Sequence, residues 1–311
     1  MQKDGNILVS IIILTYNNLD CLSKALESCL NQNYPLMEIV ISDDGSKAFD
    51  AKKVKDIIKR TCGDKKIIVR HSEKNEGTVR NFNKAIALAN GEIIVPLACD
   101  DFFYNEEVIS KIVDFFRQND YLVVTSRQLH KKADGRRLIL PHLLDEKRIK
   151  SENGYKIWLS ISAFPCYVGG SCTYYRKDVF KRYGLFDETY LLLEDWPYYL
   201  KILEHDRKIG FLDCITIQHN AGGVSAPKSG KRNSKLVNDD IKCIERVITC
   251  TKWGRIPFWD MRLLQYRYQS LKQEKNTSKF YFSFGYLDVI IYKIVRRIVR
   301  NIVTLIFENR K

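Results

Sequence analysis

Short apolar, strand-like runs alternate with helical patterns through the first 126 residues, and this order constrains the fold more than any other feature. The expected strands are residues 7–14, 38–42, 66–71, 92–97 and 121–126. The expected helices between them are residues 20–30, 50–60, 78–89 and 105–118. Strands joined in this way run parallel through right-handed crossovers. The sequence therefore predicts an α/β fold with a mostly parallel, Rossmann-like sheet flanked by helices.

Polar residues follow each of the first four expected strands. They are Thr15-Tyr16-Asn17, Asp43–Ser46, Glu73–Gly77 and Cys99–Asp101. The carboxyl ends of parallel strands meet at one edge of a sheet, and ligands bind at that edge in folds of this kind. We therefore predict a binding site there.

The pattern is weaker beyond residue 130. Residues 131–167 are polar and irregular with helical stretches. After them we expect a strand at 169–175, helices at 177–183 and 194–205, a short strand at 209–212, a loop at 219–223, and tail helices at 235–250 and 286–307.

Most of the net charge of +14 lies in the tail, where residues 221–311 hold about 19 Lys and Arg against about 7 Asp and Glu. Such asymmetry indicates an anionic partner, either nucleic acid or a membrane. In the helix at 286–307, apolar residues at helical spacing are interspersed with Lys293, Arg296, Arg297 and Arg300. This pattern is typical of a helix lying on an anionic membrane surface. A helix packed on the catalytic domain or in a homodimer is the alternative.

The nine cysteines are odd in number and form no C-x-x-C pair. They are therefore expected to be free thiols in a reducing compartment. No secretion signal and no apolar stretch of about 18 residues is present, so no transmembrane helix is expected. These features predict a cytoplasmic protein.

Several motifs in order resemble family 2 glycosyltransferases of the GT-A fold. They are Ser10–Asn17 (SIIILTYN), Ile39–Ser46 (IVISDDGS), Asn75–Gly77, Gly91–Asp101 (GEIIVPLACDD), Gly184–Asp187 (GLFD) and Glu194-Asp195, and they cover about residues 7–220. The resemblance implies a GT-A catalytic domain at residues 1–222. Within it, about 1–128 form the nucleotide-binding half and 129–222 the acceptor half. Residues 223–311 are then a basic helical extension.

For the nucleotide, the resemblance implies that Thr15, Tyr16 and Asn17 surround the base and ribose. Asp43 and Asp44 are implied to bind the nucleotide as well, with the second acid accepting a hydrogen bond from uracil. Asp-Asp-Gly-Ser is also good turn chemistry, which is the alternative. Arg80 is either a ligand of the diphosphate or an exposed helix residue.

For the metal, the resemblance places Asp100 and Asp101 at the family's acidic motif, which would bind Mn²⁺ or Mg²⁺ at the diphosphate. The family motif often reads Asp-x-Asp-Asp, and here Ala98 stands at its first position. Asp101 is expected on the metal and Asp100 on the ribose or metal. His219 is either near the metal and diphosphate or structural. An N-cap of the next helix is the alternative for the acids.

For catalysis, the resemblance makes Asp195 the base that takes the proton of the acceptor hydroxyl, with Glu194 supporting it or binding acceptor. A charged helix N-terminus is the alternative. Trp196 either stacks on an acceptor sugar or lies in the core. Gly170 either lets the acceptor approach the backbone or marks a bulge.

The predicted function is an inverting glycosyltransferase. It would move a sugar from a nucleoside diphosphate donor, with UDP favoured, to a glycan or lipid-linked acceptor in surface polysaccharide or lipopolysaccharide biosynthesis, as a peripheral protein on the inner membrane face. Two alternatives are kept. A sugar-phosphate nucleotidyltransferase would have a glycine-rich loop after the first strand, and a nucleic-acid-binding protein would have a recognisable motif, of which none is present. No nucleic-acid partner is therefore expected.

Overall fold

The computed structural model describes residues 7–62, 66–131, 135–151, 153–205, 208–219, 232–250, 252, 254–273 and 286–308. The first half is a parallel sheet in the order β3-β2-β1-β4. Its strands are β1 (Val9–Thr15), β2 (Met37–Asp43), β3 (Ile67–His71) and β4 (Ile93–Ala98). β1 pairs in parallel with both β2 and β4, so it lies at the centre of this half. Its continuous apolar run is explained by burial on both faces.

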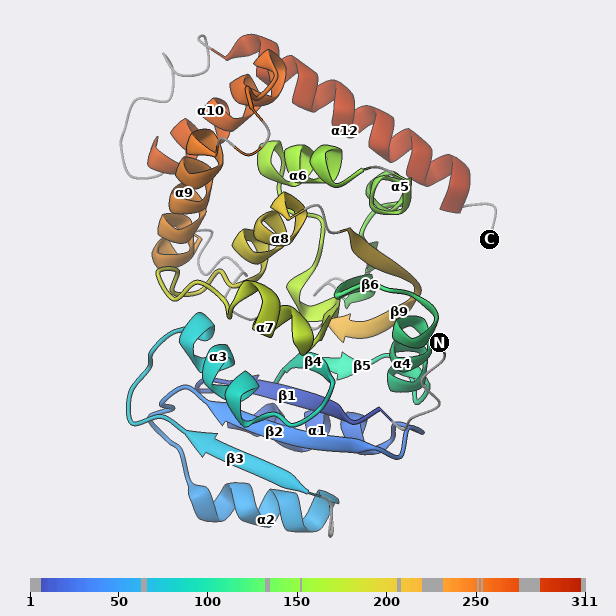
Figure 1. Ribbon diagram of the computed structural model, residues 1–311, viewed down its shortest axis with the longest axis vertical. Helices are drawn as coiled ribbons and strands as arrows, with labels where there is room; N and C mark the ends of the chain where they lie inside the picture. The colour runs from blue at the N-terminus through green and yellow to red at the C-terminus, as the bar shows by residue number, and fades with distance from the viewer. Residues whose placement is uncertain are drawn as a thin grey trace.

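The two faces of β1 pack into different hydrophobic clusters. Ile12 contacts the cluster formed with α3 (Thr78–Leu88), α6 (Gly154–Ala163), α8 (Asp195–Glu204) and α9 (Ser234–Thr249). Ile11 and Ile13 contact the cluster formed with α1 (Leu22–Leu30), α2 (Ala51–Cys62) and α4 (Val108–Gln118). Successive side chains of a strand point to opposite faces, which produces this division. Figure 1 shows α1 and α2 on one side of the sheet and α3 on the other. The helices are η1 (Leu19–Cys21), α1 (Leu22–Leu30), α2 (Ala51–Cys62), α3 (Thr78–Leu88), α4 (Val108–Gln118), α5 (Leu143–Ser151), α6 (Gly154–Ala163), α7 (Asp178–Tyr183) and α8 (Asp195–Glu204).

The second half of the sheet is mixed rather than parallel throughout. The expected fifth parallel strand, β6 (Val123–Lys131), does not pair with β4, because β8 (Thr173–Arg176) lies between them and is antiparallel to both. β9 (Ile209–His219) pairs in parallel with β6. Two further strands complete this half: β5 (Phe102–Phe103) beside β9 and β7 (Arg137–Leu140) beside β6. β4 and β8 pair although they lie about 80 residues apart in the sequence, so no local sequence pattern predicts this pairing.

Several expected boundaries were wrong, including two that lie next to the site described below. The predicted strand at 169–175 is a strand only from Thr173, since Gly170–Cys172 (η2) forms a 3-10 turn before it. The predicted short strand at 209–212 extends as β9 to His219, and its pairing with β6 has a register shift at Ser126/Arg127. This extension brings His219 to the edge where β1 and β4 end.

The tail forms three described helices, α9 (Ser234–Thr249), α10 (Phe258–Gln273) and α12 (Leu287–Glu308). α9 packs into the main core through Cys243, Ile244 and Val247. α10 packs on α9 and α6, and α12 crosses near α5 and α6 at the edge of the molecule (Figure 1). The helices expected at 235–250 and 286–307 are confirmed, and α10 was not expected.

None of the helices in the described ranges is both long enough and apolar enough to cross a membrane.

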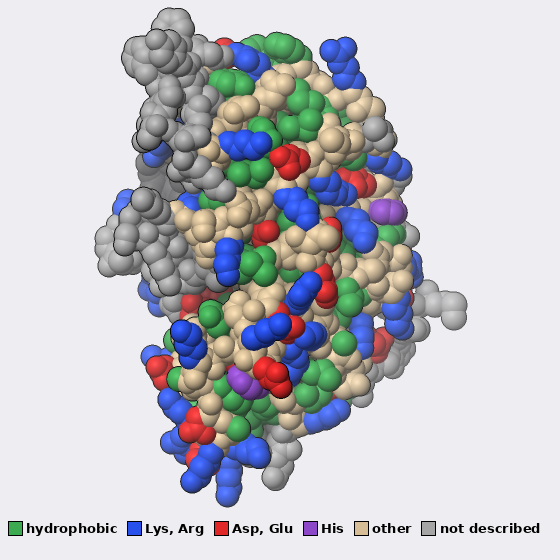
Figure 2. All heavy atoms as spheres, turned by 90° about the vertical axis from the view of Figure 1, so that its left-hand side faces the viewer, with side chains coloured by type: hydrophobic (Ala, Val, Ile, Leu, Met, Phe, Trp, Pro, Cys, Tyr) green, Lys and Arg blue, Asp and Glu red, His purple; other side chains and the backbone are tan. Residues whose placement is uncertain are grey.

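Lys and Arg side chains gather at the lower end of the face in Figure 2, over α2. There Lys52, Lys53, Lys55, Lys59 and Arg60 are all exposed. The chain therefore has a second basic surface, far along the sequence from the basic tail.

Candidate active site

A cavity of about 460 Å³ opens at the carboxyl ends of β1 and β4 and is closed on its far side by the start of α8. The predicted site residues in its lining are Thr15, Tyr16, Asp44, Asp100, Asp101, Gly170, Glu194, Asp195 and His219. Four other predicted residues do not line it: Asn17, Asp43, Arg80 and Trp196. The edge of the sheet predicted to bind a ligand is therefore hollow and acidic.

The loop after β1 is shaped by Asn17 rather than lined by it. Asn17 has a φ of 51°, in the left-handed region that asparagine tolerates. Its backbone N–H donates to Ser46 Oγ at 2.7 Å, and its Oδ1 accepts from Lys47 N at 3.1 Å. These bonds join the loops after β1 and β2, and they leave Tyr16, which is 44% exposed, at the cavity wall.

Asp43 is fully buried and does not line the cavity. Its carboxylate accepts from the N–H and the hydroxyl of Ser46, at 2.9 and 2.5 Å, and lies 2.7 Å from Nδ1 of His71. These contacts fit the turn interpretation of Asp-Asp-Gly-Ser for Asp43, and the nucleotide contact of Asp43 stays a prediction.

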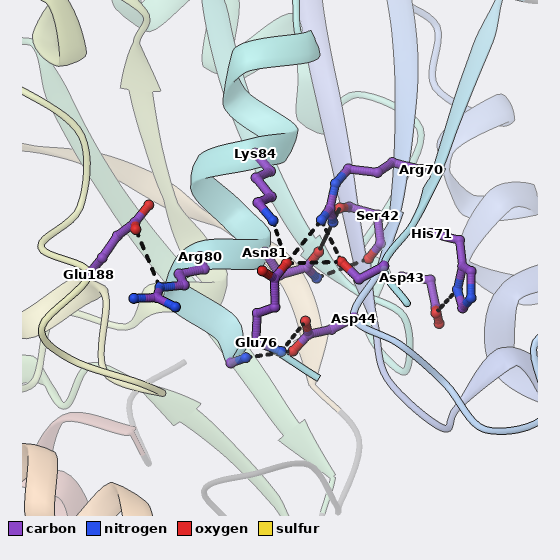
Figure 3. Close-up of polar contacts among 12 residues, drawn as sticks. Ser42, Asp43, Asp44, Arg70, His71, Glu76, Arg80, Asn81, Lys84 and Glu188 are labelled. Atoms are coloured by element: carbon purple, nitrogen blue, oxygen red, sulfur yellow. Dashed lines mark hydrogen bonds and ion pairs between the residues drawn. The ribbon is translucent and has the colours of Figure 1, made fainter. Parts of the chain in front are cut away.

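Asp44 lines the cavity and also fixes a second loop. Its Oδ1 and Oδ2 accept from the backbone N–H groups of Glu76 and Gly77, both at 2.9 Å (Figure 3). Burial raises the pKa of Asp44, and the two N–H bonds oppose this shift. The two loops lie backbone to backbone, because a Cβ on Gly45 would stand 2.3 Å from the carbonyl carbon of Lys74.

A charged network that the sequence did not reveal supports this loop (Figure 3). Glu76 accepts from Arg70 at 3.3 Å and from Lys84 at 2.5 Å, and Arg70 also donates to Asn81 Oδ1 at 2.8 Å. Arg80, which lies on α3 with Asn81 and Lys84, is half-exposed and pairs with Glu188 at 3.4 Å. The alternative of an exposed helix arginine therefore describes Arg80 in this structure.

Asp101 is completely buried beside His219. Its two carboxylate oxygens lie 2.9 and 3.1 Å from Nδ1 of His219, and this contact raises the histidine pKa against the opposing effect of burial. Burial, and next the charge of Asp101, raise the pKa of Asp100. Within the described ranges, no three His, Cys, Asp or Glu side chains are arranged to hold a metal ion by themselves.

Glu194 and Asp195 stand half-buried at the start of α8, on the opposite side of the cavity. Asp195 Oδ1 accepts from the N–H of Trp196 at 2.6 Å. Burial is the largest cause that raises the pKa of each acid, and the charge of Asp195 raises that of Glu194 further. Gly170 lies against Asp195, since a Cβ there would be 2.8 Å from Asp195 Oδ2. The glycine makes room for the carboxylate.

Trp196 lies in the core. Its side chain is 1% exposed, and the guanidinium of Arg267 sits 4.2 Å from a ring centroid. Of the two roles considered for Trp196, the structure therefore favours packing, because a covered ring cannot stack on a sugar.

Gln128 and Ser171 are among the lining residues to which the sequence assigned no role. Ser171 Oγ donates to Oε1 of Gln128 at 2.5 Å, and both line the cavity next to Gly170. Ser171 could have been found from its place after Gly169-Gly170. Gln128 could not, because the pairing of β6 with β9 alone brings it there.

Solved structures share this architecture. Over 86% of the chain and 73% of the other, it superposes on TarS 1-349 from S. aureus in complex with UDP-GlcNAc, with a TM-score of 0.61 and 17% identity. It also superposes on the mannosyltransferase PcManGT from Pyrobaculum calidifontis in complex with GDP-Man and Mn²⁺, with a TM-score of 0.60 and 15% identity. This superposition covers 98% of this chain and 88% of the mannosyltransferase chain. At such identities the likeness shows the fold, and it confirms the predicted GT-A fold.

Proteins related in sequence are named as glycosyltransferases. An uncharacterized glycosyltransferase of Haemophilus influenzae is 34% identical over 118 residues, which are 38% of this chain and 45% of the relative. One of Rickettsia typhi is 29% identical over 207 residues, 65% of this chain and 60% of the relative. The matches thus span about half the length of these relatives. The model of glycosyl transferase family 2 matches residues 10–184, more than half of the chain. The chain therefore belongs to glycosyl transferase family 2.

Proposed function

We propose that this protein is an inverting glycosyltransferase that moves a sugar from a nucleoside diphosphate donor to a glycan or lipid-linked acceptor. One observation carries the proposal: a single cavity is lined by Asp44, Asp101 and Asp195. Transfer of a sugar needs a site for the nucleotide, a site for its diphosphate and a base for the acceptor hydroxyl. The three carboxylates supply groups of the right kind at those places.

Asp44 is the residue we assign to the nucleobase. Each of its oxygens already accepts one N–H, and a carboxylate oxygen has a further lone pair for a base N–H. We propose a UDP-sugar donor, on the resemblance of the Asp-Asp-Gly-Ser motif. The solved structures above contain both UDP- and GDP-sugars, so the panel of donors below must identify the base.

The donor set near Asp101 fits a divalent cation. Carboxylate oxygens suit Mn²⁺ or Mg²⁺, and Mg²⁺ keeps positions for water and substrate phosphates. Asp101, with Asp100 and His219, would hold such an ion only together with oxygens of the donor diphosphate. When bound, the cation stabilises the negative charge of the leaving diphosphate as a Lewis acid.

Asp195 is the proposed base. Its burial raises its proton affinity, which suits a group that accepts the proton of the attacking hydroxyl. Attack from the side of the sugar opposite the leaving diphosphate inverts the anomeric carbon. Burial and the charge of Asp195 raise the pKa of Glu194 to about 8, so Glu194 stands beside the proposed base as the acid that holds its proton more tightly.

The cellular setting is proposed from α12. Ile291, Ile294, Val295, Ile298 and Ile302 form a stripe along this helix, and each is about half-exposed. A continuous apolar stripe with cations nearby is typical of a helix in a membrane interface. We propose that the stripe rests on the cytoplasmic face of the cell membrane, where lipid-linked acceptors for surface polysaccharide are found.

The proposal is tested by mixing the full chain with a panel of UDP-, GDP- and other nucleotide sugars, with Mn²⁺, with Mg²⁺ or with EDTA, and measuring nucleoside diphosphate release. Slow metal-dependent hydrolysis of one donor is expected. Asp101→Ala is expected to lower it by about 10²-fold or more, the size of a lost electrostatic contact to a leaving group. Asp114→Asn, an exposed surface acid on α4, serves as the control. Neither release nor nucleotide binding with any donor would refute the proposal.

A further inference from the structure

A second cavity, of about 320 Å³, lies between α12 and the catalytic domain. The catalytic domain lines it with two segments, residues 140–142 and 164–167. Gln128 lines both this cavity and the first one, and Gly169 precedes the Gly170 that touches Asp195. The second cavity therefore adjoins the proposed base and not the Asp44 end of the site.

The charge of this cavity is unbalanced. Its cations are Lys293, Arg296, Arg297 and Arg300, all from α12, and its only carboxylate among the described lining residues is Asp145. Asp145 is 2% exposed and is shared by Arg300, by Arg296 at 3.8 Å and by Arg148 at 3.2 Å. One carboxylate cannot neutralise these cations, so the cavity keeps a large positive potential.

Two of the arginines also have unused hydrogen-bond donors. Within the described ranges, Arg296 Nη1 and Arg300 Nε are buried and have no partner. Arg296 is held in place because its guanidinium lies 3.3 Å above the ring centroid of Phe164. Leaving such donors buried and unpaired is unfavourable. An oxyanion in the cavity would satisfy both.

Burial and neighbouring positive charges lower the pKa of two of these cations, Arg296 and Lys293. Burial, and next the charge of Arg148, lower the pKa of Arg296, and burial together with Arg267 lowers that of Lys293. Arg296 and Arg300 are covered by the catalytic domain, with 19% and 32% of their side chains exposed. They therefore point inward, whereas the apolar stripe of α12 is exposed.

We propose that this cavity, the α12 anion pocket, binds a phosphate or diphosphate group of the acceptor. The proposal rests on the transferase function proposed above. The donor diphosphate is assigned to Asp101, at the ends of β1 and β4, so an anion beside Gly169 belongs to the second substrate. Planar guanidinium groups bind phosphate oxygens in pairs, which matches the free edges of Arg296 and Arg300. The acceptor hydroxyl would then reach Asp195 while its phosphate is held at α12.

The test is a calorimetric titration of the full chain with inorganic pyrophosphate in EDTA, which keeps metal out of the donor site. Arg296→Gln/Arg300→Gln should weaken binding by roughly tenfold or more, about 1.4 kcal/mol. Lys52→Gln/Lys59→Gln, on α2, removes the same charge elsewhere and should bind as the unaltered chain does. Because the first variant also removes partners of Asp145, Arg297→Gln is measured too, and should weaken binding with no loss of melting temperature.

The source of the anion is separated by two further measurements. Asp101→Ala should keep pyrophosphate binding; its loss there would place the ion in the donor site and overturn the proposal. Binding to phosphatidylcholine vesicles with and without phosphatidylglycerol is compared for the same variants. If the pocket variants lose only vesicle binding, or bind pyrophosphate normally, the pocket is not an acceptor site. Since pyrophosphate binding needs no turnover, a failed titration and a failed donor panel are separate results.

Discussion

Three pairs of adjacent acids lie in or beside the cavity, and two of them, Asp43-Asp44 and Glu194-Asp195, have contrasting surroundings. The Asp43-Asp44 pair accepts hydrogen bonds from backbone N–H groups and a serine hydroxyl, and also contacts a histidine ring. The Glu194-Asp195 pair has neighbouring acids whose charges oppose its ionisation. The first pair is a fixed part of two loops, whereas the second pair contains the group proposed as the base. Adjacent carboxylates in one sequence can thus serve as a scaffold or as proton acceptors, depending on what surrounds them.

The largest effect is expected at the second pair. Asp195→Asn keeps the shape of the side chain but removes the proposed proton acceptor, so sugar transfer should fall by about 10²–10⁴-fold. Nucleotide binding, measured by calorimetry, should persist. Asp114→Asn on α4 is the matched control. A rate within a few-fold of the unaltered enzyme would remove Asp195 from the role of base.

A smaller effect of another kind is expected at the first pair. Asp43→Asn removes an acceptor from Ser46 or His71, and a buried donor left unpaired costs about 1–3 kcal/mol of folding free energy. Urea unfolding should show this loss, with nucleotide affinity in the folded protein changed little. If Asp43→Asn instead abolished nucleotide binding at full stability, Asp43 would be a ligand and the contrast between the pairs would fail.

The smallest effect is expected from Glu194→Gln. This substitution should raise the stability of the fold, whereas Asp43→Asn should lower it. A carboxyl whose pKa is higher in the folded than in the unfolded protein contributes favourably to folding stability at pH values below its unfolded pKa of about 4.3. This contribution is lost as the pH rises through the pKa of the folded protein. At neutral pH, removing the charge should therefore stabilise the fold by about 1 kcal/mol, and at pH 4 it should not. Thermal unfolding at both values checks this.

The sequence predicted the local part of this molecule well. Every helix and strand from β1 to α4 except the two-residue β5 was expected, because each is specified by residues near in sequence. Of the site, Thr15, Asp44, Asp101 and Asp195 were predicted and do share one cavity. Side chains whose direction depends on partners far away were not assigned: Asp43 points to His71, and Arg80 to Glu188.

By itself the sequence determined the strand-helix alternation, the acids at the strand ends and an amphipathic tail helix, since periodicity and turn chemistry act over a few residues. The tertiary structure decided that β8 separates β4 from β6, that Trp196 lies in the core, and which side of α12 is covered. A pattern at 286–307 cannot show that Asp145, more than 140 residues earlier, attracts Arg296 and Arg300 inward. Charges attract through space regardless of chain separation, so the cationic cavity beside Asp195 exists only in the folded protein.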